Sequence, residues 1–155
     1  MMRIGFGFDS HEFKSGVPLR IGGLTLQHDQ GLSGHSDGDV LLHAITDALL
    51  GAVAAGDIGA FFPPNDPKWR GANSVVFIEQ AMRHIEQAGY RVGNVDCTLV
   101  LAAPKIGPHA KTIQQSVAKL LKVDPSAVGI KAKTPEGLNL DGTAVAHVVV
   151  LLEKR

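Results

Sequence analysis

The sequence is poor in cysteine, in aromatic residues and in long apolar runs. Cys97 is the only cysteine among 155 residues, which excludes a disulfide within the chain, and its apolar surroundings predict a small buried side chain in a reducing compartment. No apolar run approaches the roughly 20 residues of a transmembrane helix, and the N-terminus lacks the apolar core of a secretory signal. We therefore expect a cytoplasmic protein without a membrane segment.

The chain also lacks an excess of charge of either sign. Fifteen basic and fifteen acidic residues give a net charge of zero, and no basic cluster stands out. Because nucleic-acid binding requires a basic surface, we do not expect a nucleic-acid partner. The length suffices for one hydrophobic core, and the sequence shows no linker, internal repeat or low-complexity tract. Residues 1–155 are therefore predicted to form a single domain.

Alternating apolar residues predict strands in several parts of the chain. In residues 3–9, RIGFGFD, the side chains of Ile4, Phe6 and Phe8 fall on one face of a strand. A hairpin around two adjacent glycines is predicted from residues 19–21 and 24–27. Three further runs, 95–103, 128–133 and 144–152, are also predicted to be strands.

Helical periodicity predicts three helices: one from Asp39 towards Gly56, one over 74–88 and one over 108–121. The polar segment 28–34 is predicted to be a loop. The segment 57–74 has three prolines and no helical period, so it is either an ordinary surface connection or a mobile cover over a ligand.

This order of elements is typical of an α+β domain, with a mixed sheet and helices packed on one face. The other face of such a sheet also needs cover. The valine- and leucine-rich strands suggest that another subunit supplies it.

The first helix carries polar residues of chemical interest. Asp39, His43 and Asp47 follow each other at intervals of four, opposite an apolar stripe, and Ser36 three residues before Asp39 resembles a capping arrangement. The N-terminus of a helix also attracts anions such as phosphate. A lone histidine on a polar helix face is most often only solvated, so the helix by itself does not define a site.

Asp9 and His11 are candidate partners for His43. Residues i and i+2 of a strand share a face, so this carboxylate and imidazole converge on one point if the first strand continues. With His43 they form a carboxylate and two imidazoles, a set that suits a catalytic zinc site with three protein ligands and one open position. An Asp-x-His pair alone is a weak signal. Four other histidines have no acid partner within a short motif and are predicted to be structural or solvent-facing: His28, His84, His109 and His147.

Four stretches of the chain form a specific combination: RIGFGFDSH, GLSGHSDGDVLLHAITDALLGAVAAGDIGAFFP, NVDCTLVLAAPKIGPH and IKAKTPEGL. Together they resemble the 2-C-methyl-D-erythritol 2,4-cyclodiphosphate synthase family, zinc-dependent enzymes of the non-mevalonate isoprenoid pathway. The resemblance runs from Met2 to about Leu138. It implies conversion of 4-diphosphocytidyl-2-C-methyl-D-erythritol 2-phosphate to 2-C-methyl-D-erythritol 2,4-cyclodiphosphate with release of CMP.

The resemblance also implies roles for individual residues. Asp9, His11 and His43 correspond to the zinc ligands, and His35 and Thr134 to a pair that stabilises the transition state. Glu136 corresponds to the residue beside a second divalent ion, magnesium or manganese, on the substrate diphosphate. Residues implied in binding the phosphate, the sugar-like hydroxyls or the cytosine are Ser36, Asp57, Ile58, Gly59, Phe62, Pro63, Asp66, Leu101, Ala102, Ala103, Pro104, Lys105, Ile106 and Gly107. Lys133, beside Thr134, is a further hypothetical phosphate contact.

The resemblance also implies a homotrimer with active sites between adjacent subunits. In the family, one subunit contributes the zinc and phosphate residues and its neighbour contributes the cytosine pocket. The chain departs from the family after Glu136, where Gly137-Leu138-Asn139-Leu140 replaces the usual residues and the following segment is shorter. In the family those residues line a central cavity that has been proposed to bind isoprenoid phosphates. Whether this chain binds such a ligand stays open.

Three other functions compete with the cyclase. The same three ligands could serve a zinc phosphohydrolase, in which a metal-bound hydroxide attacks and a linear phosphate results. A non-catalytic trimeric protein that binds isoprenoid phosphates is disfavoured by the altered segment after Glu136. A purely structural zinc site is disfavoured because closed structural sites have four ligands.

Overall fold

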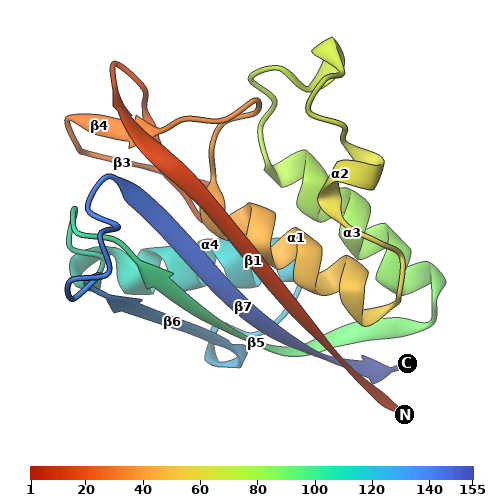
Figure 1. The fold of residues 1–155 in the computed structure, drawn as a ribbon. Helices are drawn as coiled ribbons and strands as arrows, with labels where there is room; N and C mark the ends of the chain where they lie inside the picture. Colours follow the sequence, from red (N-terminus) through yellow and green to blue (C-terminus); the bar gives the residue numbers. More distant parts are fainter.

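A five-stranded mixed sheet with the strand order β4-β1-β7-β5-β6 forms the centre of the fold (Figure 1). The computed structural model describes residues 1–155. Only β5 and β6 pair in parallel; the other neighbours are antiparallel. A separate hairpin consists of β2 and β3. The bounds are β1 (Met2–Ser15), β2 (Leu19–Ile21), β3 (Leu24–Leu26), β4 (Gln30–Leu32), β5 (Tyr90–Val100), β6 (Val128–Lys133) and β7 (Thr143–Lys154).

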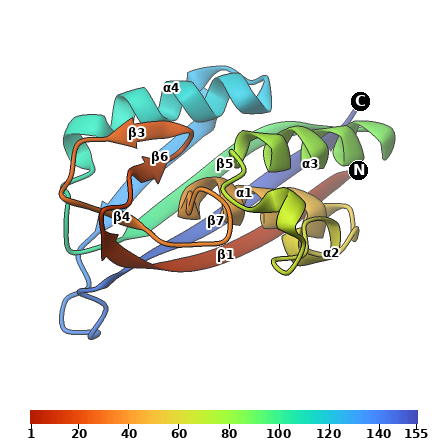
Figure 2. The same cartoon turned by 90° about the horizontal axis from the view of Figure 1, so that it is seen from above.

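The three longer helices lie on one face of this sheet (Figure 2). Of these, α1 packs against β1 and β7, and α4 against β6. None of the helices is long and apolar enough to cross a membrane. The bounds are α1 (Val40–Ala52), α2 (Ile58–Phe61), α3 (Val75–Gln87) and α4 (Ala110–Leu121), with 3-10 turns at Pro67–Trp69, Gly107–His109 and Pro125–Ala127. The predicted α+β class, with a mixed sheet and helices on one face, is confirmed.

The predicted strands are present, and β7 occupies the middle of the sheet. The largest differences in bounds are in two strands: β1 continues to Ser15, and β5 runs from Tyr90 to Val100 instead of 95–103, with a bulge between Val92 and Asn94. The bounds of β3 and β7 differ by one or two residues. The prediction of a loop over 28–34 is wrong in part, because Gln30–Leu32 forms the edge strand β4 beside the end of β1. Three residues around a glycine carry no alternation that could have revealed a strand.

The two faces of β1 have different chemistry. Ile4, Phe6 and Phe8 point away from the helices and are 71, 59 and 48% exposed. Gly5 and Gly7 are buried on the opposite face, against the backbone of α1. A Cβ at Gly7 would lie 1.8 Å from the carbonyl oxygen of Ala44. The absence of side chains at these positions therefore allows α1 to lie directly on the strand.

The first helix is buried on nearly all sides, whereas its periodicity predicts one apolar and one polar face. Asp39 is fully buried, His43 is 8% exposed, and Thr46 on the same helix is fully buried. The sheet, α3 and neighbouring loops surround α1, so its polar residues face other parts of the protein instead of water.

The capping arrangement also differs from the prediction. Asp39 is itself the N-cap residue of α1, and its carboxylate accepts hydrogen bonds from the backbone N–H of Leu42, Gly22 and Gly23 at 2.7–3.0 Å. Burial raises the pKa of Asp39, and these three N–H groups partly offset that effect. Asp39 therefore ties the β2–β3 turn to the start of α1, and Ser36 is free for another role.

The sequence predicts a loop without helical structure over 57–74, but the structure has short helical elements there. It contains α2 and the 3-10 turn Pro67–Trp69. Phe62 packs against Trp69 and against Phe77 of α3, with ring centroids 4.8 and 4.4 Å apart. These aromatic contacts attach the segment to the body of the protein.

We predict that replacement of Gly7 by alanine destabilises the protein by about 3 kcal/mol or more, because the new methyl group collides with backbone that cannot turn aside. Gly51→Ala is the matched control: a Cβ on this helical glycine would meet only one atom, at 3.9 Å, and the change should stabilise by about 0.5–1 kcal/mol. Urea unfolding of both variants measures the difference. Equal free energies of unfolding would contradict the close-packing argument.

Candidate active site

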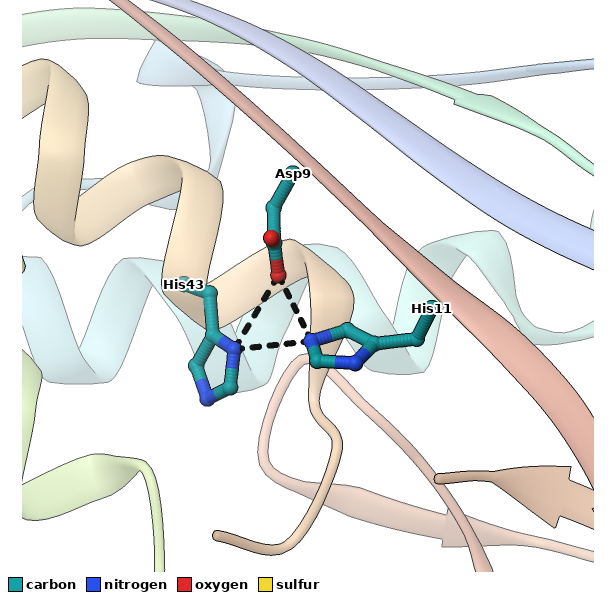
Figure 3. A group of neighbouring side chains, drawn as sticks. All are labelled: Asp9, His11 and His43. Atoms are coloured by element: carbon teal, nitrogen blue, oxygen red, sulfur yellow. Dashed lines mark hydrogen bonds and ion pairs between the residues drawn. The ribbon is translucent and has the colours of Figure 1, made fainter. Parts of the chain in front are cut away.

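Three side chains meet where α1 crosses β1 (Figure 3). Asp9 and His11 project from the same face of β1 as Gly5 and Gly7, and His43 comes from the first turns of α1. Asp9 Oδ2 lies 2.8 Å from His11 Nε2 and 3.0 Å from His43 Nδ1, and the two ring nitrogens are 3.0 Å apart. The structure thus brings together the three residues that the sequence proposed as zinc ligands.

The outer nitrogen of His11 is anchored by the backbone. Its Nδ1 lies 2.7 Å from the carbonyl oxygen of Ser33, which can only accept, so Nδ1 carries the hydrogen and donates it. When the ring is neutral, the lone pair of Nε2 points to the space between Asp9 and His43. This is the tautomer in which Nε2 can bind a metal.

The carboxylate and His11 reinforce each other's charge. Burial is the largest single influence on Asp9 and opposes its ionisation, but hydrogen bonds from His11 and His43 outweigh it and lower the pKa of Asp9 to about 2. Burial likewise opposes protonation of His11, yet the hydrogen bond and attraction to Asp9 raise its pKa overall. The ionised carboxylate therefore attracts positive charge to the point between the three side chains: protons on the ring nitrogens, which a bound metal ion would displace.

His43 is held on its outer side by two hydroxyl groups. Its Nε2 lies 2.7 Å from Ser74 Oγ and 3.0 Å from Ser36 Oγ. The hydroxyl of Ser74 in turn donates to Oδ1 of Asp37, and the backbone N–H of Ser74 donates to Oδ2 of Asp37 at 2.8 Å. Ser74 is the residue that precedes α3, and it is fully buried.

The donor set fits a zinc ion. Two imidazole nitrogens and one carboxylate oxygen face one another, and in a tetrahedral zinc site such atoms lie roughly 3.3 Å apart. The observed separations of 2.8–3.0 Å are within a few tenths of an ångström of that value. No other set of three histidine, cysteine or acidic side chains in the chain converges in this way.

A cavity of about 220 Å³ opens beside these ligands. Its walls come from the loop before α1, from the segment 57–74 and from α3, and its lining residues are His11, His35, Ser36, His43, Ile58, Gly59, Phe62, Pro64, Trp69 and Phe77. His35 donates from Nε2 to the carbonyl oxygen of Asp66 at 3.0 Å. The site thus combines a metal-binding set with polar groups at the wall of a partly apolar hollow.

A family model described as the YgbB family matches residues 2–153. The chain belongs to this family. A curated relative from Koribacter versatilis, named 2-C-methyl-D-erythritol 2,4-cyclodiphosphate synthase, is 86% identical over the full length of both chains. A chloroplastic relative of the same name from Arabidopsis thaliana is 53% identical, over 99% of this chain and 68% of its own length.

A solved structure of a 2C-methyl-D-erythritol-2,4-cyclodiphosphate synthase in a CDP-bound form superposes with a TM-score of 0.92 at 44% identity. The match covers 97% of this chain and 100% of that one. The resemblance inferred from the sequence motifs is therefore confirmed, and the chain is an enzyme of the YgbB family.

A second cavity, of about 300 Å³, lies where β5 and β6 end. Most residues that the family resemblance assigned to the cytosine line it, together with Lys133 and Thr134; they are Leu101, Ala102, Pro104, Lys105, Ile106 and Gly107. Ala103 does not line this cavity. The residues that the resemblance assigned to one ligand thus lie, with one exception, around one hollow.

Some predicted site residues lie apart within one YgbB-family chain. His35 lines the cavity beside the metal ligands, and Thr134 lines the second cavity. Glu136, close to Thr134, accepts a hydrogen bond from the Thr134 hydroxyl. No single cavity of the chain therefore contains the complete set of expected catalytic residues.

In the segment 57–74, the structure separates cavity residues from supporting ones. Ile58, Gly59 and Phe62 line the first cavity, but Pro63 does not, and Pro64 takes its place. The carboxylate of Asp57 caps α2 by accepting from Ala60, and that of Asp66 caps the turn Pro67–Trp69 by accepting from Lys68.

Sequence reasoning missed five residues of the site: Asp37, Pro64, Trp69, Ser74 and Phe77. Asp37 was visible inside the specific block after His35, but nothing in the sequence linked it to a serine 37 residues later. Trp69 and Phe77 reach the cavity because an aromatic cluster with Phe62 folds the segment onto α3. Only the packing of that segment could reveal them.

The other histidines lie outside both cavities. His84 packs against Phe61 with ring centroids 4.6 Å apart, and His147 contacts Phe8 at 5.2 Å. The expectation that His28 lacks an acid partner is wrong, because its Nε2 lies 3.3 Å from the carboxylate of Asp29.

Proposed function

We propose that this YgbB-family enzyme is the zinc-dependent cyclase that converts 4-diphosphocytidyl-2-C-methyl-D-erythritol 2-phosphate to 2-C-methyl-D-erythritol 2,4-cyclodiphosphate. A 2-phosphate oxygen of the substrate bonds to the β-phosphorus of the diphosphate. The bond from that phosphorus to the bridging oxygen of the α-phosphate breaks, and CMP leaves with the electron pair. The reaction needs neither a protein nucleophile nor water, so positioning and charge neutralisation carry the catalysis.

The observation that carries this proposal is the convergence of Asp9, His11 and His43 at the edge of a cavity that also contains His35 and Ser36. These three side chains would hold zinc, and Glu136 would lie beside a second ion, magnesium or manganese. Such ions supply Lewis acidity and positive charge at a diphosphate when they are bound.

The chain's own residues orient the substrate and limit access of water. Ser36 would donate a hydrogen bond to the phosphate, and His35 would lie beside it. Asp57, Ile58 and Gly59 would contact the hydroxyls of the erythritol. The aromatic cluster beside them, in which Phe62 is 9% exposed, lines the cavity with apolar surface. A dry cavity favours ring closure because hydrolysis is the competing reaction.

The second cavity would bind the cytosine through backbone groups around Pro104 and Lys105. A CDP-bound form is known for a relative that matches 97% of this chain, which supports a cytidine nucleotide as the ligand. Thr134 and Lys133 at the same cavity would then face the phosphates of the nucleotide.

The separation of His35 from Thr134 supports a homotrimer in which neighbouring subunits join the two cavities. The face of the sheet opposite the helices exposes Ile4, Phe6, Phe8 and Val149, a contiguous apolar patch that is typical of an interface between proteins. We propose that this patch lies between subunits, and that the enzyme acts in the cytoplasm.

Phosphorus NMR of the zinc- and magnesium-supplemented enzyme tests the reaction. We expect the substrate signals to be replaced by those of the cyclic diphosphate and CMP. His43→Ala should lower the rate by more than about 100-fold, since even changes to residues that only support a metal ligand cost about 10–100-fold. His28→Ala, outside both cavities, is the control and should keep the wild-type rate.

Linear phosphates in place of the cyclic product would identify a hydrolase and overturn the cyclase. Zinc binding without any turnover would instead favour a binding protein.

Lys133→Ala tests the role of the lysine at the second cavity. Removing a charged hydrogen-bond donor to phosphate should raise the KM for the diphosphocytidyl substrate by roughly three- to tenfold, with little change in kcat. Lys131→Ala is the matched control, since Lys131 lies on the same strand, pairs with Asp96 and does not line the cavity. An unchanged KM in the Lys133 variant would show that this side chain does not contact the substrate.

Light scattering after gel filtration tests the assembly. We expect a mass three times the 16.4 kDa of one chain. Phe6→Asp should dissociate the assembly, because it places a charge in the apolar patch, and activity should fall with it. Val76→Asp, which also places a charge at an exposed apolar position but on α3, should leave the mass unchanged. A wild-type protein of 16.4 kDa would refute the trimer.

A further inference from the structure

We infer that Ser74 and Asp37 are positioning residues for the metal ligand His43: Asp37 orients the Ser74 hydroxyl, which holds the His43 ring with Nδ1 open to the metal. The inference rests on the metal site proposed above. It concerns two side chains that neither the sequence patterns nor the proposed reaction assigned to a role.

The contacts form a continuous chain from Asp37 to the metal-binding set. The carboxylate of Asp37 bonds the hydroxyl of Ser74, whose oxygen is 2.7 Å from Nε2 of His43. On the other edge of the ring, Nδ1 of His43 is 3.0 Å from Asp9 Oδ2. One imidazole thus has its inner nitrogen at the proposed metal position and its outer nitrogen in a buried hydrogen-bond network.

The direction of each hydrogen bond follows from the donors around Asp37. Its two oxygens receive the backbone N–H of Asp39 at 3.1 Å and that of Ser74 at 2.8 Å, so both act as acceptors. The single proton of the Ser74 hydroxyl must then point to Asp37. The serine oxygen has only lone pairs left for His43, so Nε2 carries the hydrogen and Nδ1 has the free lone pair that a metal requires.

Ser36 is the alternative partner of Nε2, at 3.0 Å, and the structure favours Ser74. The hydroxyl of Ser36 has no carboxylate that fixes its direction, and Ser36 lines the cavity, where a phosphate would compete for it. Ser74 is closer, fully buried and linked to Asp37. An outer partner of this kind holds a histidine ligand in one tautomer and one orientation.

The same two residues connect separate parts of the site. Asp37 donates its backbone N–H to the carbonyl oxygen of Ala72 at 3.0 Å, which joins the loop before α1 to the end of the segment 57–74. Ser74 precedes α3, and Phe77 on that helix packs against the ring of His43 with centroids 5.7 Å apart. The position of His43 therefore depends on α3 as well as on its own helix.

The test measures the zinc affinity of the full-length protein by competition with a chromophoric chelator. We expect Ser74→Ala and Asp37→Asn each to weaken zinc binding about 10–100-fold. In Asp37→Asn, the new amide NH₂ group must face one of the donors around Asp37. It either meets a backbone N–H, so that one hydrogen bond is lost, or donates to the Ser74 oxygen, so that the Ser74 hydroxyl turns its proton away. Ser74→Thr keeps the hydroxyl and should retain most of the affinity.

Thr46→Val is the matched control for the loss of a buried hydroxyl. Thr46 is fully buried on the same helix, and its hydroxyl donates to the carbonyl oxygen of Leu42 at 2.8 Å without contact to the network. Its zinc affinity should equal that of the wild type. If Thr46→Val weakens zinc binding as much as Ser74→Ala does, general loss of packing explains the effect and the inference is overturned.

Histidine side-chain NMR of the zinc-loaded, ¹⁵N-labelled protein shows which ring nitrogen of His43 carries the proton, and a general loss of stability does not change that tautomer. We expect His43 to carry its proton on Nε2, with slow exchange in the wild type and faster exchange in Ser74→Ala. A proton on Nδ1, or identical exchange in both proteins, would overturn the inference.

The outcomes separate this inference from the metal site itself. If His43→Ala abolishes zinc binding while Ser74→Ala and Asp37→Asn bind like the wild type, the metal site stands and the positioning role is refuted. If the wild type binds zinc no better than His43→Ala, the proposed site fails, and the positioning role with it.

Discussion

The direct contact between α1 and the glycine face of β1 is the constraint on which the rest of the site depends. Gly5 and Gly7 leave no side chain between strand and helix, so the helix backbone rests on the strand. Asp9 and His11 lie on the same face of β1, and the helix places Nδ1 of His43 3.0 Å from Oδ2 of Asp9. Any larger residue in place of these glycines would push α1 away and separate the three side chains.

Buried polar residues hold the loops around this contact. Asp39 binds three backbone N–H groups and fastens the β2–β3 turn to the start of α1. Asp37 and Ser74 do the same for the loop before α1 and the start of α3. Burial of such groups costs free energy unless each is hydrogen-bonded, and here each carboxylate has several donors. Buried hydrogen bonds to Asp37 and Asp39 therefore hold the loops at the cavity wall in place.

Two features of the isolated chain have one common explanation. His35 and Thr134 lie in different cavities, and the sheet face opposite the helices exposes phenylalanine and isoleucine side chains. The proposed trimer covers the apolar face and completes each site from two subunits. In that arrangement the outward side chains of β1 would stabilise the assembly and the inward ones would bind the metal, so one alternating strand would serve both purposes.

The sequence by itself determined the elements with strong local periodicity, the shared face of Asp9 and His11, and the membership of the family. These features depend on neighbouring residues, and their spacing is legible in the chain. Only the tertiary structure decided that α1 is buried on nearly all sides, that Gln30–Leu32 joins the sheet as an edge strand, and that Asp37 and Ser74 support His43. The last of these joins residues 31 and 37 positions apart in the sequence. Hydrogen bonds of this kind leave no periodic signal, because they arise only when packing has brought distant segments together.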